Sequence, residues 1–489
     1  ESNFLTKMVD AIPGISTKEP SMLSFNAEVA QLLPGTSNIV DGKGTSYIDD
    51  FESAITPFRL GGNVLSWKLA STPKTDDGYY DGGSQMPNDL SINYTRAKLA
   101  WYIIDNVFYR TSGNSRPPNL TEEDLQNNYS RAVIPQEIFK FRDREVVNTN
   151  LPVFDLAFYP SERGSYNYNP NLQPDGTLPD VRRNWGGITR AITSDVDFDQ
   201  TNIEYLEFWL MDPFINATNG DLNNPNGLIN DGINPAEANT TGGKLIFHLG
   251  SISEDVMKDS RHAFENGLPA DGDTTRTTNN TWGRVTQEQY LTNAFDNSEI
   301  ARPNQDVGMD GVINTDEPNY FADFVSDLNV NGEALDRILE DVSADNFQYF
   351  LGSELDADDA KILERYKEFN LTDGNSPLVV GTTDFTPVGT TFPDNEDLNF
   401  DNTLSDLEEY YEYELDLRPG SLEVGKNFVT EVITNEINGQ RVNWYLIRIP
   451  ILKPSRIQGN IVGFKSIRFI RSIMTDWQQP AVLRMVKFQ

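Results

Sequence analysis

The sequence predicts a mainly β protein, a sandwich with large helical and loop insertions. Short runs of alternating apolar and polar residues occur along most of the 489-residue chain, and such alternation indicates half-buried strands. Turns rich in Gly and Pro separate these runs. Many short strands joined by such turns are typical of a sandwich. The sequence shows no internal repeat of fixed period.

The first expected element is a strand in the stretch "MLSFNAEVAQLL" at 22–33. Leu23, Phe25 and Val29 share one face of this strand, and polar residues occupy the other. About ten alternating residues are also what one strand of a transmembrane barrel requires. Two interpretations therefore stay open, an ordinary half-buried strand and a strand next to a barrel.

Further strand-like runs follow through the rest of the chain. In the run "YYEYELDL", Tyr411, Tyr413 and Leu415 face one way and acidic residues face the other. The run "YLEFWLM" is apolar on both faces, as expected of a strand buried inside a sandwich. The expected strands lie at 47–51, 66–71, 97–104, 154–160, 186–192, 203–211, 244–250, 410–417, 443–451, 464–473 and 481–488.

Three segments in the middle of the chain show the apolar spacing of helices. The first begins at Glu254 and stops at Gly267, a residue type that commonly ends helices. The third begins with Asp356 and Asp359, a pair typical of helix caps. The expected helices span 254–267, 333–342 and 356–369.

The charge of the chain limits its partners. It carries 39 Lys plus Arg against 74 Asp plus Glu, a net charge of −35. Such a surface repels nucleic acid and anionic lipid, so we expect neither as a partner. Residues 441–489 reverse the trend, with nine Lys or Arg and a single acid, Asp476. The simplest interpretation is a set of strands paired with acidic neighbours, and an anionic partner is the alternative.

The residues that carry most catalytic chemistry are scarce. The chain has no cysteine, which excludes disulfides and thiol mechanisms. Its two histidines, His248 and His262, stand in no zinc spacing and are interpreted as structural. No nucleophile elbow and no phosphate-binding loop occur. We therefore expect no catalytic and no cofactor-binding residues.

Carboxylates and tryptophans leave a carbohydrate interpretation open. Among 74 acids, some pair will lie at a glycosidase-like separation by chance, so abundance does not decide the question. Trp185, Trp282 and Trp477 either stack on sugars or fill the core.

The stretch "DVGMDGVINTDE" at 306–317 is the best metal candidate. It approaches the calcium-loop pattern D-x-[DN]-x-[DN]-G-x5-E, but Gly308 at position three offers no side chain. Hard cations require several oxygen ligands, and a cation here would pin a long loop. The alternative is an acidic turn around "DG". The expected ligands of a structural calcium ion are Asp306, Asp310, the carbonyl of Val312, Asn314 and Glu317.

The order of several motifs resembles the jelly rolls of carbohydrate-binding modules. These motifs are "YIDDFES", "SWKLAS", "NWGGITRAI", "IEYLEFWLMD", "KLIFHLG" and "NWYLIRIPI". The resemblance implies a galactose-binding-like sandwich, and Asp50 and Glu52 match the opening acids of a calcium site in those modules. The last strand carries Arg484 and Lys487 where the modules have an Asp, which weakens that site.

A second resemblance extends over nearly the whole chain. The blocks "ESNFLTKMVDAIP", "FNAEVAQLLPG", "YIDDFESAITPFRLG", "FYPSERGSYNYNP", "IEYLEFWLMDPF", "GSISEDVMKD" and "QDVGMDG" are similar to the SprA/Sov family, the outer-membrane translocons of the type IX secretion system in Bacteroidetes. The family forms a giant barrel with an extracellular cap and also serves gliding motility. Folded cargo with a C-terminal signal domain passes through it, and PorV-type shuttle and plug subunits associate with it.

The resemblance implies that the chain is an internal segment of a longer polypeptide embedded in the outer membrane. We expect a barrel-adjacent strand and linker at 1–46 and a jelly-roll sandwich at 47–489, with insertions near 71–150 and 250–405. The expected function is a non-enzymatic cap or large loop at the cell surface that shapes the export path. The alternatives are a carbohydrate-binding module and a polysaccharide-degrading enzyme.

Overall fold

The chain divides into two units, Glu1–Pro57 and Phe58–Gln489. The computed structural model describes residues 4–16, 57–75, 86–110, 116–140, 150–215, 229, 239–261, 268–269, 271–287, 302–305, 308–369 and 395–489. In the first unit, helix α1 spans Phe4–Asp10. The strands expected at 22–33 and 47–51 lie outside the described residues, as do Asp50 and Glu52.

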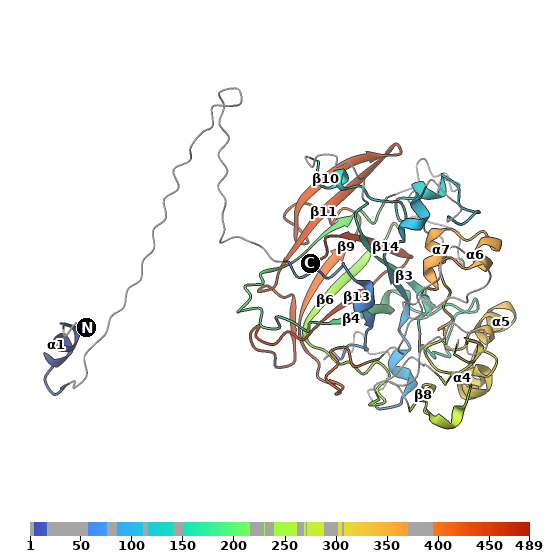
Figure 1. Ribbon diagram of the computed structural model, residues 1–489, viewed down its shortest axis with the longest axis horizontal. Coiled ribbons are helices and arrows are strands. Elements are labelled where there is room, and N and C mark those ends of the chain that lie inside the picture. Colours follow the sequence, from blue (N-terminus) through green and yellow to red (C-terminus); the bar gives the residue numbers. More distant parts are fainter. Residues whose placement is uncertain are drawn as a thin grey trace. The chain divides into compact units, whose positions relative to one another are not determined.

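Two six-stranded antiparallel sheets form the second unit (Figure 1). The first sheet has the order β1 (Lys68–Leu69), β4 (Trp185–Ala191), β13 (Phe469–Thr475), β6 (Gly243–Ser251), β9 (Glu409–Leu417) and β12 (Arg456–Gln458). The second has the order β10 (Val429–Ile437), β11 (Gln440–Pro450), β5 (Tyr205–Met211), β14 (Ala481–Val486), β3 (Val153–Arg163) and β2 (Ala97–Tyr102). A small hairpin pairs β7 (Thr277–Asn279) with β8 (Arg284–Thr286).

The predicted mainly β class is confirmed by these sheets. The expected strands after the first two are confirmed, with two exceptions. The run at 66–71 yields only the two residues of β1, and the run at 464–473 forms a strand only from Phe469, where β13 begins. Strands β7, β8, β10 and β12 were not predicted. The galactose-binding-like jelly-roll topology stays a prediction.

Aromatic side chains fill the space between the two sheets. Phe208 of β5 and Phe247 of β6 belong to opposite sheets, and their ring centroids lie 5.8 Å apart. Phe488, just after β14, packs on both rings with centroid distances of 5.7 Å. Burial of such large side chains is the main source of sandwich stability, and it binds the C-terminal end of the chain into the core.

The basic C-terminal strands pair with acidic neighbours, as the charge pattern predicted. Arg471 of β13 binds Glu408 through two bonds of 2.8 Å, and both side chains are buried. Arg484 of β14 donates from Nε to Asp155 of β3 at 3.0 Å. Because Arg484 occupies the position of an acid in carbohydrate-binding modules, the last strand offers no cation ligand at that point.

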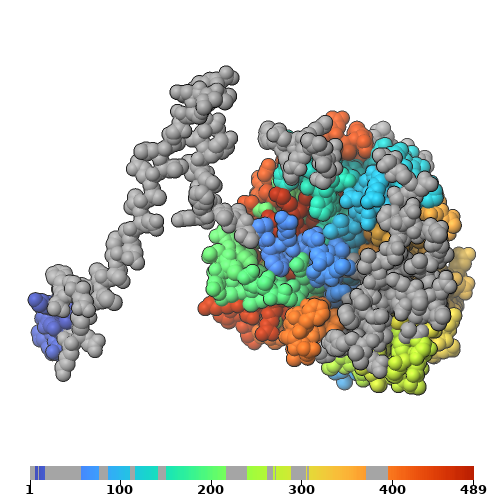
Figure 2. Space-filling model, viewed as in Figure 1, coloured from blue at the N-terminus to red at the C-terminus, as the bar shows by residue number. Residues whose placement is uncertain are grey.

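Helices cluster in the stretch between β8 and β9 (Figure 1). Figure 2 shows this part of the chain at the surface of one side of the second unit. The helices are α2 (Arg302–Gln305), α3 (Glu317–Tyr320), α4 (Ala322–Asp327), α5 (Glu333–Glu340), α6 (Ser353–Ala357) and α7 (Ile362–Lys367). Short 3-10 turns occur at Val64–Ser66, Leu90–Asn93, Asn106–Tyr109, Asp124–Gln126, Pro135–Glu137, Val181–Arg183 and Thr274–Arg276. Among the described residues, no helix has the length and apolarity needed to cross a membrane.

Two helix predictions need correction. The helix expected at 356–369 is split into α6 and α7, because Asp359 has a left-handed φ of 56°. The helix expected at 254–267 is wrong for residues 254–261, which form bends with φ of 56° at Lys258 and 60° at Ser260. The rest of that segment lies outside the described residues. The helix expected at 333–342 is confirmed by α5.

Candidate metal centre

The loop between α2 and α3 is held against the β7–β8 hairpin by backbone contacts. The Arg284 amide donates to the Asp310 carbonyl at 2.6 Å. A Cβ on Gly311, where φ is +73°, would lie 2.0 Å from the Arg284 carbonyl. Only glycine fits there, because the approach is closer than any side chain permits and the φ is left-handed. The Gly of the calcium-loop pattern therefore has a local structural role.

Two of the predicted ligands come together in this loop. Asp310 is buried, with Oδ1 accepting from the Val312 amide at 2.7 Å and Oδ2 accepting from the Ser343 hydroxyl at 2.5 Å. Glu317, at the start of α3, is fully buried, and its Oε2 accepts from the amides of Val342 and Ser343 at 2.6 and 3.1 Å. Asp310 and Glu317 each contribute an oxygen to one carboxylate group.

Two further predicted ligands, Asn314 and Val312, make hydrogen bonds through their nitrogen atoms. Asn314 donates from Nδ2 to Asn346 at 2.7 Å, so its side chain is engaged elsewhere. Val312 enters the site through its amide, which donates to Asp310. Asp306 lies outside the described residues.

The third carboxylate is Asp345, which the sequence pattern did not indicate. Its Oδ2 accepts from the amides of Met309 and Asp310 at 2.7 and 2.9 Å. A Cβ on Gly308 would lie 2.4 Å from Asp345 Oδ1. Position three of the loop is thus empty because a carboxylate from another part of the chain fills its space.

Oxygens of Asp310, Glu317 and Asp345 all lie within 4.8 Å of one another. Glu317 Oε1 and Asp345 Oδ1 have no hydrogen-bond donor among the described residues. Burial and the neighbouring Asp341 raise the pKa of Glu317 to about 7, and burial raises the pKa values of Asp310 and Asp345 well above their usual range. Three converging buried carboxylates with orphaned oxygens are the donor set that suits a hard cation.

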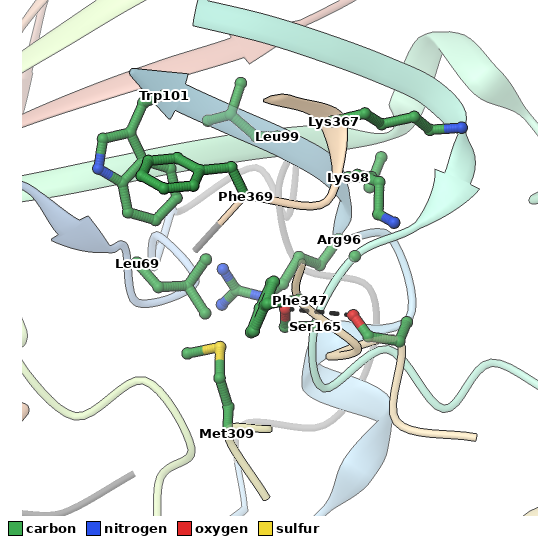
Figure 3. A pocket seen from close by; sticks show the side chains of 13 residues that line it. Leu69, Arg96, Lys98, Leu99, Trp101, Ser165, Met309, Phe347, Lys367 and Phe369 are labelled. Carbon is green, nitrogen blue, oxygen red and sulfur yellow. Dashed lines mark hydrogen bonds between the residues drawn. The ribbon is translucent and has the colours of Figure 1, made fainter. Parts of the chain in front are cut away.

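A small pocket lies beside this loop (Figure 3). Met309 and Phe347 form part of its apolar wall, and the cations that line it are engaged. Lys367 pairs with Glu162 at 2.8 Å, and Lys98 pairs with Glu368. The side chains drawn in Figure 3 include no carboxylate and no histidine. This pocket therefore supplies no acid–base pair for glycoside hydrolysis.

The candidate tryptophans and His248 belong to the core. Trp185, Trp282 and Trp477 are at most 1% exposed, so the idea that they stack on external sugars is wrong. His248 is fully buried between Arg471 and Glu412. His262 lies outside the described residues.

Residues 320–489 match a family model, SprA_N, described as a motility related/secretion protein. This segment, about a third of the chain, is similar to the SprA family. No curated protein matches the chain. The protein is therefore related to motility and secretion, as the sequence blocks implied.

The SprA_N segment contains six of the twelve strands of the two sheets and part of the metal centre. It begins inside α3, so it includes Asp345 and all strands from β9 to β14. Asp310 and Glu317 precede it. The three carboxylates thus come from both this segment and the residues before it.

Proposed function

We propose that this chain is an extracellular cap or large-loop segment of the protein-conducting outer-membrane channel of the type IX secretion system. In this role it shapes the path along which folded cargo leaves the cell. The observation that carries the proposal is the match of residues 320–489 to a motility and secretion family. A sandwich with a filled aromatic core suits a rigid wall better than a carrier that opens and closes.

The charge of the chain supports an aqueous position for this segment. A net charge of −35 disfavours contact with anionic lipid headgroups. The proposed partners are cargo proteins with a C-terminal signal domain, the PorV-type shuttle and the plug subunit, with the parent chain embedded in the outer membrane. Nucleic acid has no place in this assembly.

We propose a role without catalysis. His248 accepts hydrogen bonds from Arg471 on Nδ1, which removes that nitrogen as a base. The buried carboxylates of the metal centre accept hydrogen bonds from backbone amides, an arrangement that suits a structural role better than proton transfer. A carbohydrate-binding module would need exposed aromatic rings, and the three tryptophans considered for it are buried.

We also propose a structural calcium ion in the metal centre, held by Asp310, Glu317 and Asp345. The fit rests on their converging oxygens and on the two orphaned buried atoms. Bound there, the ion would offset most of the negative charge of the three carboxylates and fix α3 against the loop that follows α5. Calcium titration of wild type and Asp345→Asn tests it, because the variant should lose this ion.

The export role is tested by deleting residues 58–489 in frame from the parent gene. Secretion of signal-bearing cargo into the medium should be lost or misregulated, because the export path loses its wall. The assembled parent barrel is measured in the outer-membrane fraction of the same cells. The matched control is Glu423→Gln, and it should leave secretion unchanged. Glu423 is exposed, and among the described residues its side chain pairs with Lys426.

Wild-type secretion by an assembled barrel that lacks residues 58–489 would contradict the proposal. A single carboxylate substitution that stops secretion while the protein stays folded and assembled would favour a chemical role. Tight, selective binding on a glycan array would favour the carbohydrate-binding alternative.

A further inference from the structure

Three loops of the second unit share one sequence pattern. The pattern Glu-Asp-[Val/Leu]-x-x-Asp-[Ser/Asn] occurs at 254–260 as "EDVMKDS", at 340–346 as "EDVSADN" and at 396–402 as "EDLNFDN". The intervals between the copies differ, so a search for a fixed period does not find them. The copy at 340–346 contains Asp345 of the metal centre.

The three copies fold in the same way. In each, the carboxylate of the first Asp accepts the amides of the residues four and five positions later. The residue before the second Asp has a left-handed φ, namely 56° at Lys258, 56° at Ala344 and 58° at Phe400. The hydrogen bonds run from Asp259 and Ser260 to Asp255, from Asp345 and Asn346 to Asp341, and from Asp401 and Asn402 to Asp397, at 2.7–3.2 Å.

In two of the loops, a glutamate from elsewhere caps the next two amides. Glu317 accepts from Val342 and Ser343 in the metal centre. In the same way, Glu396 Oε1 accepts from Val256 and Met257 at 2.6 and 3.4 Å. The loop at 254–260 therefore repeats the local construction of the metal centre, with Glu396 in the place of Glu317.

The repeated construction creates a second carboxylate group. Asp255, Asp259 and Glu396 each offer an oxygen, and these oxygens lie within 4.8 Å of one another. Glu396 is only 1% exposed, and its Oε2 has no hydrogen-bond donor within the described parts of the chain. An ionisable oxygen that is buried without a donor is costly. In the metal centre, Glu317 Oε1 is orphaned in the same way.

The polar neighbours of this group are already engaged. Lys258 donates its ammonium to Ser253 at 2.9 Å and to Asp406 at 2.5 Å. Asn280 donates to Asp259 Oδ2 at 2.7 Å. These contacts leave Glu396 Oε2 without a donor, and the group keeps an excess of negative charge.

The copy at 396–402 serves as an internal comparison. The glutamate that reaches it, Glu254, has both oxygens satisfied, by the amides of Leu398 and Ser405 at 2.8 and 2.9 Å. No group of three converging carboxylates involves Asp397 or Asp401 in the described residues. A satisfied glutamate thus accompanies the copy that lacks a carboxylate group, and an orphaned oxygen accompanies both copies that have one.

We propose that Asp255, Asp259 and Glu396 form a second site for a hard divalent cation, calcium by its oxygen ligands. The ion supplies the positive partner that Glu396 Oε2 lacks. Because Glu396 reaches across from the copy at 396–402, the bound ion ties that loop to the one at 254–260. Carboxylate-rich, irregular oxygen sets favour calcium over magnesium, which requires near-octahedral geometry.

Calcium stoichiometry of the full chain tests the proposal. The protein is stripped with a chelator and titrated with calcium by calorimetry in excess magnesium and about 0.15 M salt, which screens weak surface binding. Wild type should bind two ions tightly. Glu396→Gln should bind one, because the amide oxygen still accepts from Val256 and Met257 while the charge is lost. Asp345→Asn should lose only the ion of the metal centre.

Asp401→Asn is the matched control, since Asp401 is the exposed counterpart of Asp259 in the comparison copy, and it should bind two ions. If Glu396→Gln fails to fold by circular dichroism, Asp259→Asn replaces it with the same expectation. Equal stoichiometry in wild type and a folded Glu396→Gln would overturn the proposal, as would a wild type that binds no calcium. One ion in wild type, retained in Asp345→Asn and lost in Glu396→Gln, would support this site and remove the other.

Discussion

At the scale of single residues, the protonation of the buried His248 depends on side chains from the neighbouring strands of its sheet. Arg471 donates to His248 Nδ1 from Nε at 3.0 Å, while His248 Nε2 contacts Glu412 at 3.1 Å. An arginine only donates, so Nδ1 accepts and the proton sits on Nε2. Burial and the Arg471 charge lower the pKa of His248 to about 4.

The lowered pKa of His248 makes stability depend on pH. The unfolded chain protonates this histidine near pH 6.5, whereas the folded chain keeps it neutral until about pH 4. Its contribution is therefore full above pH 6.5 and is lost as the pH falls from 6.5 to 4. The loss amounts to roughly 3 kcal/mol at 1.36 kcal/mol per pKa unit.

The comparison is between wild type and His248→Asn in urea unfolding at about pH 7 and pH 4.5. Asn keeps an acceptor near Arg471 but does not titrate. The free energy of unfolding of His248→Asn should therefore fall less than that of wild type between the two pH values. Carboxylates with raised pKa values, such as Asp155, act with the opposite sign but equally in both proteins. Identical pH dependence in the two proteins would show that His248 is not the responsible group.

At the scale of elements, short polar side chains decide where helices and turns form. The stretch 254–261 has helical spacing, yet Asp255 captures the amides of Asp259 and Ser260. This capture competes with the helical hydrogen bonds. The opposite error concerns β10, which the alternation did not reveal. Its hairpin with β11 turns at Asn438 and Gly439, with φ of 50° and 75°, and Asn-Gly is the strongest short-range hairpin signal.

Gly439→Ala should destabilise the protein by about 1–2 kcal/mol, because an L residue is strained at a left-handed φ. A Cβ at this position would meet no atom within 4 Å, so the effect is conformational and not a clash. Gly62→Ala is the matched control, since Gly62 has no left-handed φ and its Cβ would make only an ordinary 3.7 Å contact. Thermal unfolding of the two variants measures the difference. A Gly439→Ala variant as stable as Gly62→Ala would contradict the assigned turn.

At the scale of the whole molecule, strands from the two ends of the second unit complete each other's sheets. Strand β6 lies between β13 and β9, and β3 lies between β14 and β2. The stretch near 71–150, expected as an insertion, supplies the edge strand β2. The stretch near 250–405 holds the β7–β8 hairpin and helices α2 to α7. The sheets therefore close only when residues after Tyr410 are present.

A fragment of residues 47–245 should not fold cooperatively. In the full unit, β14 covers an edge of β3, β13 covers an edge of β4 and β11 covers an edge of β5. The fragment would expose these edges, and exposed strand edges aggregate. Expression, light scattering and thermal unfolding measure the outcome, with residues 58–489 as the positive control. A soluble fragment with a cooperative transition would show that the unit consists of independent domains.

Local patterns predicted more of the fold than of the candidate sites. Alternation located β6 and β9 because side-chain direction in a strand follows from neighbouring residues alone, and a continuous apolar run located β5. The calcium-loop pattern located Asp310 and Glu317 because both lie within one contiguous stretch of sequence. It missed Asp345, and the recurrence of the Glu-Asp pattern at irregular intervals was the signal that could have revealed it and Asp259.

The sequence by itself determined the mainly β class, the pairing of a basic C-terminal segment with acids, and the similarity to a motility and secretion family. Each depends on composition, on periodicity or on contiguous motifs. Only the tertiary structure decided that Trp185 and Trp282 are buried, and which carboxylates converge. Convergence depends on the path of the chain. Glu396 precedes β9 and Asp255 and Asp259 follow β6, so the pairing of these two strands brings the three carboxylates close together. The separation of these residues along the sequence does not predict their proximity, because the packing of the sheets determines it.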